Sequence, residues 1–374
     1  MFHQKKHLVI IILIVLFAFN ISSVFAEDVT LRILCWKGYS KPYIEGFQKL
    51  ISEKYNINVT IEISNVSDPT EFWQKSRAKK VDLISPAHNI LKSNKWPFIK
   101  GTVNVALPIN LDNIPNYKYV LPFLQKSIFV TENNSVYGVP YTMGPYGLAY
   151  NADKVAEPKS WNVLWSDKSK NTITLSKDYS DCNIYISALA LGAKYDQLYD
   201  YDKLISRIPK KALEVKLKKL ALNTFSFWEG TANYKEFPKL TYAATWGYAV
   251  AQANINGGNW KMADPQEGTT LWVDHWVITY ALKDKPLEKK LAEEWINYCL
   301  SPELQVGVIR YWGVSPVVTN INDKLTKSEI SIYKPGQNDY WRTLSLWENQ
   351  TTRTSNGYIN MWRGSQSKNQ ICKQ

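Results

Sequence analysis

The chain has 374 residues, a formal net charge of +12 and no internal repeat or low-complexity linker. This length is more than one hydrophobic core usually organises, so it predicts two lobes. The basic residues are dispersed and accompany no nucleic-acid reading motif, which argues against a nucleic-acid partner and indicates ordinary surface charge.

The first 26 residues have the three-part pattern of a secretory signal peptide. Lys5 and Lys6 precede an apolar run at 8–19, and a polar stretch then ends in VFA at 24–26. The run is shorter than the ~20 residues that span a bilayer, and no comparable run follows. We therefore expect cleavage after Ala26, leaving 348 residues of net charge +10, because the leader takes two lysines and no acid from the total of +12. Cys35 lies too far beyond that point to be a lipidated first residue, so we expect a soluble, periplasmic protein.

The cysteines and histidines do not form a metal-site pattern. The cysteines of the mature chain are Cys35, Cys182, Cys299 and Cys372. Export allows disulfides, but four cysteines permit three full pairings, and the sequence does not choose among them. No C-x-x-C spacing occurs and two of the four histidines lie in the leader, so we expect neither a metal nor a cofactor.

Strands and helices alternate along the mature chain. Strands are predicted at 29–36 and 57–64, with an amphipathic helix at 41–55 between them. A buried strand at 79–89 runs into a turn, and strand-like residues at 136–151 are interrupted by glycine and proline. This order predicts an α/β fold.

The second half of the chain continues the alternation. The predicted elements are a helix at 182–192 after the acid-bearing turn TLSKDYSD, a helix at 211–222, a strand at 240–253 that turns helical after Trp246, a strand at 270–280, and helices at 286–300 and 301–312. In the helix at 211–222, an apolar stripe of Leu213, Leu217 and Leu220 is widened by Val215 and Leu222, and the lysines form a solvated face.

The stretch TLWVDHWVITY at 270–280 places an acid within a predicted strand. Alternation puts Trp272, Asp274 and Trp276 on one face of the strand and His275 on the other. Because a buried carboxylate is costly without a partner, two interpretations stay open. Asp274 lies either at an exposed end of the strand or where it binds a cation.

A set of motifs occurs in the order seen in one family. The motifs are CWKGYSKPY, VDLISPAHN, VYGVPYTMGPYGLAYN, TWGYAVAQA, TLWVDHWVI, and LAEEWINYCLSPELQ followed by YWGVSP. Over nearly all of the mature sequence, the chain resembles the periplasmic spermidine/putrescine-binding proteins of ABC importers. The resemblance implies the two-lobe periplasmic binding protein fold, with crossing hinge segments and a ligand in the interlobe cleft. It also implies that the chain leaves lobe one near Tyr146, so that lobe one comprises 27–145 and 275–325 and lobe two comprises 146–274 and 326–374.

The resemblance also implies a ligand-binding set. Its members are Trp36, Tyr39, Asn89, Asp178, Asp181, Trp246, Trp272 and Asp274. Aromatic faces attract cations, and carboxylates accept charge-assisted hydrogen bonds from ammonium groups. Ala87 and Asn89 replace a hydroxyl-bearing and an aromatic residue of the family, which removes contacts expected for a linear polyamine. Helix N-terminal capping is the alternative for the acids at 178 and 181, and core packing is the interpretation we favour for Trp276 and Trp295.

The sequence thus predicts the periplasmic solute-binding component of an ABC importer, with a polyamine such as spermidine or putrescine, or another cationic amine, as ligand. We expect a monomer that works with an ABC permease in the inner membrane and has no catalytic residues. One alternative is an oligosaccharide-binding or other small-solute-binding protein of the same fold. A secreted hydrolase is a further alternative, but no G-x-S-x-G, H-E-x-x-H or Cys/His signature is present.

Overall fold

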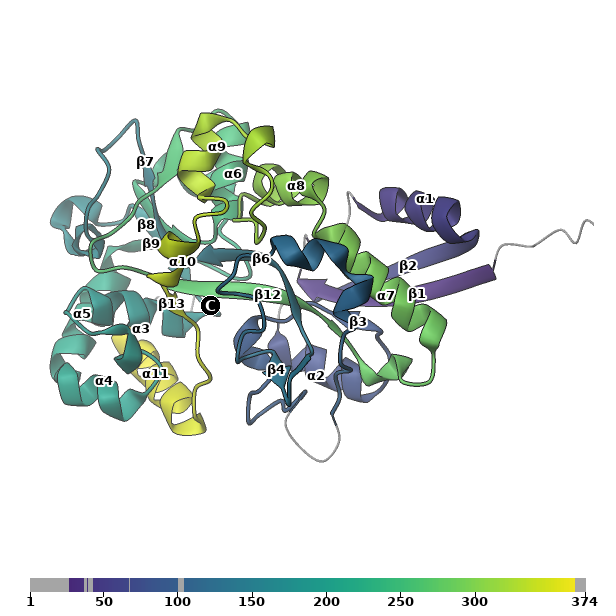
Figure 1. Cartoon of the computed structure of the whole chain (residues 1–374). Helices are drawn as coiled ribbons and strands as arrows, with labels where there is room; N and C mark the ends of the chain where they lie inside the picture. Colours follow the sequence, from purple (N-terminus) through teal and green to yellow (C-terminus); the bar gives the residue numbers. More distant parts are fainter. Residues whose placement is uncertain (1–26, 37–38, 40–42, 67, 100–103, 367–374) are drawn as a thin grey trace, which may run out of the picture.

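A computed structural model describes residues 27–36, 39, 43–66, 68–99 and 104–366. The predicted leader and Cys372 lie outside this range. The described chain folds into two α/β lobes, each built on its own sheet (Figure 1). Within the described residues, no helix has the length and apolar character needed to cross a bilayer.

The sheet of lobe one has six strands, in the order β13-β12-β3-β1-β2 with β6 also paired to β12. These strands are β1 (Glu27–Trp36), β2 (Ile57–Val66), β3 (Leu83–Ile84), β6 (Val139–Pro145), β12 (Thr270–Ile278) and β13 (Ser345–Leu346). Strands β1 and β2 are parallel along their whole length, so a crossover helix must join them. That helix, α1 (Ile44–Tyr55), buries Phe47 and Ile51 and ends at Asn56 in the left-handed conformation.

Helices surround this sheet, and a short hairpin lies beside it. The helices of lobe one are α1, α2 (Pro69–Arg77), α7 (Pro286–Cys299) and α8 (Pro302–Trp312), and the hairpin is β4 (Thr131–Glu132) with β5 (Ser135–Val136). Ser301 caps α8 as predicted, since its side chain accepts a hydrogen bond from the backbone N–H of Leu304. Two further helices, α9 (Lys327–Tyr333) and α10 (Asn338–Arg342), follow α8.

The sheet of lobe two has five strands, in the order β11-β7-β10-β8-β9. Its strands are β7 (Gly147–Asn151), β8 (Ile173–Ser176), β9 (Thr224–Trp228), β10 (Tyr242–Thr245) and β11 (Trp260–Met262). The helices of this lobe are α3 (Ser180–Leu189), α4 (Tyr201–Arg207), α5 (Lys210–Asn223), α6 (Gly247–Ile255) and α11 (Thr352–Ser365). The predicted change from strand to helix after Trp246 is confirmed, because β10 ends at Thr245 and α6 begins at Gly247.

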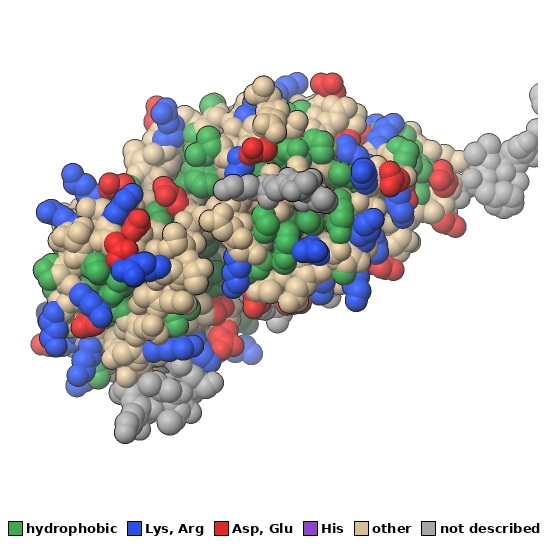
Figure 2. Space-filling model, turned by 90° about the horizontal axis from the view of Figure 1, so that it is seen from below, with side chains coloured by type: hydrophobic (Ala, Val, Ile, Leu, Met, Phe, Trp, Pro, Cys, Tyr) green, Lys and Arg blue, Asp and Glu red, His purple; other side chains and the backbone are tan. Residues whose placement is uncertain are grey.

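One prediction for helix α5 is wrong. Leu213, Leu217 and Leu220 are buried as expected, but Val215 and Leu222 are 58% and 52% exposed. A residue two positions from a buried one lies on the other side of a helix, so these two side chains are outside the apolar stripe. Lysines and arginines are spread over the face seen in Figure 2, with Asp and Glu among them.

The two lobes have separate hydrophobic cores. Trp276 and Trp295 are fully buried in lobe one, with ring centroids 5.9 Å apart, which confirms the prediction that they pack in the core. Trp161 and Trp362 belong to the core of lobe two. Cys35, Cys182 and Cys299 are buried, and Cys182 and Cys299 are free thiols. The predicted two-lobe α/β fold is thus confirmed.

The chain crosses between the lobes at Tyr146, which lies between β6 and β7. It returns through β12 and passes to lobe two again after β13. The predicted boundary between 274 and 275 falls inside β12, and both β12 and β13 belong to the sheet of lobe one, although 270–274 and 345–346 were predicted for lobe two. The exact division of the chain between the lobes remains a proposal. His88 joins two of the crossing segments, because its Nε2 lies 2.7 Å from the Trp347 carbonyl oxygen and its Nδ1 accepts a bond from the Val273 N–H.

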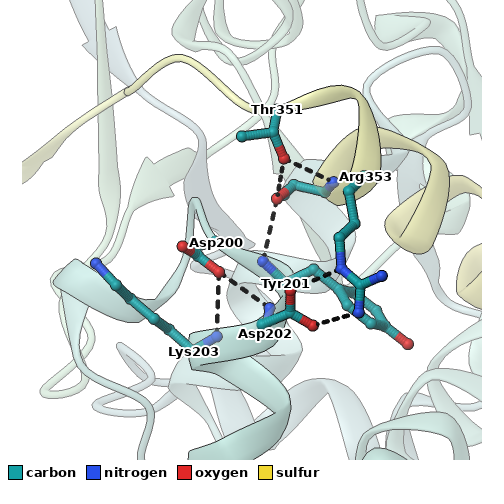
Figure 3. Close-up of polar contacts among 7 residues, drawn as sticks. Asp200, Tyr201, Asp202, Lys203, Thr351 and Arg353 are labelled. Atoms are coloured by element: carbon teal, nitrogen blue, oxygen red, sulfur yellow. Dashed lines mark hydrogen bonds and ion pairs between the residues drawn. The ribbon is translucent and has the colours of Figure 1, made fainter.

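Helix α11 is fixed to lobe two by polar contacts with α4 (Figure 3). Arg353 pairs with both carboxylate oxygens of Asp202 at 2.6 and 2.7 Å. Asp200 caps α4, and the Thr354 hydroxyl accepts a hydrogen bond from the Tyr201 N–H at 3.1 Å. The segment 347–351 therefore runs from the sheet of lobe one to an anchored helix of lobe two.

Candidate ligand-binding site

Asp274 lies in the middle of β12 and is 4% exposed. Its backbone faces Thr142 of β6, and it also forms a bridge to Ala87. The interpretation of Asp274 as an acid at an exposed strand end is therefore wrong. The Tyr39 hydroxyl donates a hydrogen bond to Asp274 Oδ2 at 2.9 Å.

Burial raises the pKa of Asp274 to about 8, although hydrogen bonds from the Tyr39 and Trp36 side chains oppose the shift. Among the described residues, no lysine, arginine or histidine forms an ion pair with Asp274. Loss of solvent and the nearby Asp274 charge raise the pKa of Tyr39 well above its usual value, so this phenol stays a donor. A positive charge next to Asp274 would favour its ionised form.

Two tryptophans from different lobes meet beside this acid. The rings of Trp272 and Trp246 are nearly perpendicular, at 87°, with centroids 6.3 Å apart. Trp272 covers Gly144 on the neighbouring strand so closely that a Cβ there would lie 2.9 Å from its ring. Trp246 is held from the other lobe, since its Nε1 donates to the Gly230 carbonyl at 2.9 Å. The predicted wall of Trp246 and Trp272 is therefore one contiguous surface.

Further aromatic residues, which the sequence interpretation did not include, extend this wall. The centroid of Trp246 lies 5.1 Å from Tyr146, 5.3 Å from Tyr179 and 5.9 Å from Trp347. Tyr179 stands between the two predicted acids in the sequence KDYSD, which was the available signal. Trp347 lies far along the chain, in a segment with no motif to mark it.

In lobe one, Tyr39 is itself held by aromatic neighbours. Its ring centroid lies 5.2 Å from Tyr141 and 5.0 Å from Trp312. Tyr141 in turn stacks on the buried Trp276 at 4.6 Å. The Tyr39–Asp274 pair therefore lies against the packed core of lobe one, which limits how far either side chain can move.

The three predicted acids converge on Tyr179. Burial raises the pKa of this phenol well above its usual value, and the charges of Asp178, Asp274 and Asp181 raise it further. Asp178 and Asp181 of lobe two and Asp274 of lobe one are thus all close enough to Tyr179 to interact with it electrostatically. Within the described residues, no group of His, Cys, Asp and Glu has an arrangement that could hold a metal ion.

Asp178 is an exposed acid that joins two loops of lobe two. Its carboxylate accepts hydrogen bonds from the Ser176 hydroxyl at 2.8 Å and the Gly230 N–H at 2.7 Å. The N-cap position of α3 belongs to Tyr179, so Asp178 is not the cap residue. The Asp178 carboxylate thus holds the turn before α3 against the loop that contains Gly230. The carbonyl of Gly230 in turn accepts the hydrogen bond from Trp246.

Asp181 lies in the first turn of α3. Its carboxylate accepts hydrogen bonds from the Tyr185 hydroxyl at 3.1 Å and from Gln350 Nε2 at 3.0 Å. Burial raises the pKa of Asp181 despite these bonds. A carboxylate in the first turn also interacts favourably with the helix dipole, so a structural role accompanies the proposed ligand role.

Trp36 and Asn89 are the two remaining members of the predicted set. Trp36 ends β1, donates its backbone N–H to the Ser85 hydroxyl at 3.2 Å and packs edge-on against Phe72. Asn89 follows His88 in a short 3-10 turn and reaches the Glu348 carbonyl at 3.5 Å, while its Oδ1 is buried without a partner. Trp36 thus belongs to the group around Asp274, whereas Asn89 contacts the crossing segment.

Comparisons with known proteins identify relatives along most of the chain. Residues 43–332 match the family model of bacterial extracellular solute-binding proteins. The putrescine-binding periplasmic protein of Escherichia coli (strain K12) is 20% identical over 352 residues, which cover 89% of this chain and 90% of that protein. A putrescine/agmatine-binding protein of Pseudomonas aeruginosa is 23% identical over 251 residues, which cover 60% of this chain and 63% of that protein.

A solved structure shows the same fold. The spermidine/putrescine ABC transporter substrate-binding protein of Streptococcus pneumoniae has a TM-score of 0.69 and 20% identity, with 90% of this chain and 99% of that chain covered. Its similarity confirms the periplasmic-binding-protein architecture. Since the family model spans residues of both lobes and more than half of the sequence, the chain belongs to the bacterial extracellular solute-binding proteins.

Proposed function

We propose that this protein is the periplasmic solute-binding component of an ABC importer, and that it captures a polyamine or another small cationic amine between its lobes. The observation that carries the proposal is Asp274, a buried carboxylate without an ion-pair partner among the described residues, beside Trp272 and Trp246. An isolated buried charge is unfavourable, so this acid is suited to a ligand that supplies the missing positive charge.

The eight residues of the predicted set have distinct roles in this proposal. Asp274 accepts a hydrogen bond from a ligand ammonium group, and Tyr39 orients the carboxylate. Trp246 and Trp272 cover the ligand methylene groups and attract its charge through their ring faces. The acids of lobe two, Asp178 and Asp181, attract a second ammonium group. Trp36 borders the first ammonium site, and Asn89 borders the crossing segment.

The names of the similar proteins support the ligand class. Putrescine occurs in the names of the relatives from Escherichia coli and Pseudomonas aeruginosa, and agmatine in the second of them. Ala87 and Asn89 replace family residues that contact linear polyamines, so the proposal includes amines other than putrescine and spermidine. A partner permease in the inner membrane, a monomeric state and the absence of catalysis belong to the same proposal.

Calorimetry of the purified mature chain tests the ligand class. Putrescine, spermidine and agmatine are titrated beside a neutral amino acid and maltotriose, with a screen of ester, peptide and glycoside hydrolysis run in parallel. We expect binding of at least one di- or polyamine and no turnover. Binding of maltotriose without any amine binding would favour the oligosaccharide-binding alternative, and turnover would favour the hydrolase.

The proposed location depends on the leader. Lys5, Lys6, the apolar run at 8–19 and the VFA sequence at 24–26 support export and cleavage after Ala26. Mass spectrometry of the exported protein should find an N-terminus at Glu27. An intact N-terminus on the exported protein would contradict this part of the proposal.

A further inference from the structure

Two glycines each follow an aromatic residue of the site region. Gly247 follows Trp246 and begins α6 of lobe two. Gly313 follows Trp312 and is the left-handed C-cap of α8 in lobe one, with a φ of 59°. Trp312 packs on Tyr39, the hydrogen-bond partner of Asp274. Each glycine is therefore one residue away from an aromatic side chain in the region where the ligand is proposed to bind.

The two glycines are in contact with each other. A Cβ on Gly247 would lie 1.7 Å from the carbonyl oxygen of Gly313, and a Cβ on Gly313 would lie 2.8 Å from the carbonyl oxygen of Gly247 and 2.5 Å from the Cβ of Ala251. Backbone atoms cannot rotate away as a side chain can. Even one methyl group therefore requires α6 and α8, which lie side by side in Figure 1, to move apart.

This contact joins the lobes and not two parts of one lobe. Helix α6 contributes Ala249, Val250 and Ala253 to the core of lobe two, whereas α8 contributes Ile309 and Trp312 to the core of lobe one. Separation of the helices can therefore occur by lobe movement, with both cores left intact. Such movement would carry Trp246 away from Trp272.

We propose that Gly247 and Gly313 are positioning residues that allow the lobes to close far enough for Trp246 to reach the ligand held at Asp274. This inference rests on the proposed function for the identity of the ligand. The contact itself does not depend on it. A methyl group at this position keeps the lobes apart, and amine binding weakens although no ligand contact has been removed.

Gly247→Ala is the most informative variant. Alanine is a better helix former than glycine, and Gly247 does not have the positive φ of Gly313, so the change should not destabilise α6 itself. Gly313→Ala adds the methyl from the other lobe but also strains a left-handed residue. Gly364→Ala in α11 is the matched control, because a Cβ there meets nothing within 4 Å.

Spin labels on the two lobes measure closure directly. Lys49→Cys on α1 and Ile255→Cys on α6 place labels at side chains that are 77% and 67% exposed. Both changes are made in a Cys372→Ser background of the mature chain. Pulsed dipolar spectroscopy then gives the interlobe distance with and without putrescine, while calorimetry gives the putrescine affinity and thermal unfolding shows whether each variant is folded.

The parent and Gly364→Ala should share a short interlobe distance that putrescine favours. Gly247→Ala should keep a longer distance in both conditions, with an affinity at least tenfold weaker and an unfolding midpoint at or above that of the parent. Gly313→Ala is used if Gly247→Ala does not fold. Distances for Gly247→Ala that match the parent, or an affinity within twofold, would overturn the inference. If the parent binds no amine, the proposed function is wrong. The interlobe distances of the parent and of Gly247→Ala still test the glycine contact in that case.

Discussion

The Tyr39 hydroxyl and the Asp274 carboxylate form a 2.9 Å hydrogen bond between residues 235 positions apart in the sequence. The bond fixes one oxygen of a buried acid. Among the described residues, this acid has no cationic partner. Protonation of Asp274 and binding of an ammonium group therefore compete, since each relieves the cost of the same buried charge.

Amine affinity should depend on pH because of this competition. Burial raises the pKa of Asp274 to about 8, so the free protein must lose a proton to bind a cation below that pH. Affinity for putrescine should rise from pH 6 to pH 8, by at most about tenfold per pH unit, and then level off. Calorimetry in two buffers of different ionisation enthalpy counts the released protons. Equal affinity at pH 6 and pH 8, with no proton release, would contradict this prediction.

The same pKa shift should affect the free energy of unfolding. The folded state keeps a proton on Asp274 up to a pH of about 8, whereas the unfolded state loses it near a pH of ~4. This residue therefore makes the parent less stable as pH rises through that window, by at most about 1.4 kcal/mol per pH unit. Asp274→Asn cannot ionise, so its stability relative to the parent should increase from pH 5 to pH 8. Urea unfolding measures the stability of both proteins at each pH. If the difference in stability between them is the same at pH 5 and pH 8, the raised pKa of Asp274 is wrong.

His88 should make the protein sensitive to acid. Its Nε2 donates to the Trp347 carbonyl and its Nδ1 accepts from the Val273 N–H, an arrangement that requires the neutral ring. Burial lowers the pKa of His88 to about 4, so its contribution to stability is present above pH ~6.5 and is lost as pH falls towards 4. His88→Gln should lower stability at pH 7 and reduce the loss between pH 6.5 and pH 4.

Thermal unfolding of the parent and His88→Gln across this range measures the effect. His275 is the comparison residue: burial lowers its pKa to about 3, so His275→Gln should also reduce the loss in acid, but it should lower stability at pH 7 less than His88→Gln because its Nε2 has no partner in the described structure. His275→Gln should leave the links from residue 88 to the crossing segments in place. An unchanged acid dependence in His88→Gln would show that His88 does not set it.

Trp272→Ala should reduce both stability and binding. The indole is 6% exposed and covers Gly144, so its removal should cost about 3–5 kcal/mol of unfolding free energy. Amine binding should also weaken, because the ligand loses apolar cover and cation–π attraction. Trp272→Phe keeps a ring and should lose less of both. Urea unfolding and calorimetry on the same samples separate the two effects, and wild-type affinity in a folded Trp272→Ala protein would exclude Trp272 from the site.

Local patterns in the sequence predicted the elements well where the period was clear. The amphipathic pattern at 41–55 corresponds to helix α1, which buries Phe47 and Ile51, whereas β12 is buried along its whole length, so neither face of that strand is exposed. Apolar character alone does not predict burial at Val215 and Leu222, because their positions on the helix face solvent. The motif resemblance predicted Asp274 and Trp246 as site residues, and the fold brings both close to Tyr179. Their role in ligand binding stays a prediction.

Other parts of the site depend on contacts between distant segments and have no local signal. Trp347 joins the aromatic wall only because the chain crosses between the lobes a third time before α11. The contact between Gly247 and Gly313 is visible only when both lobes are placed, since each glycine separately is an ordinary helix-end residue. A single sequence provides neither the relative position of the lobes nor the distances across them.

Calorimetric titration of Asp274→Asn with the amine that binds the parent most tightly tests the central claim most directly. The amide keeps the shape of the side chain but removes its charge, so binding should weaken by about 2–5 kcal/mol, the range for truncating one partner of a buried charge pair. Trp272→Phe, titrated beside it, should weaken binding less. If Asp274→Asn binds the amine as tightly as the parent does, then Asp274 does not receive the ligand cation and the proposed site is wrong.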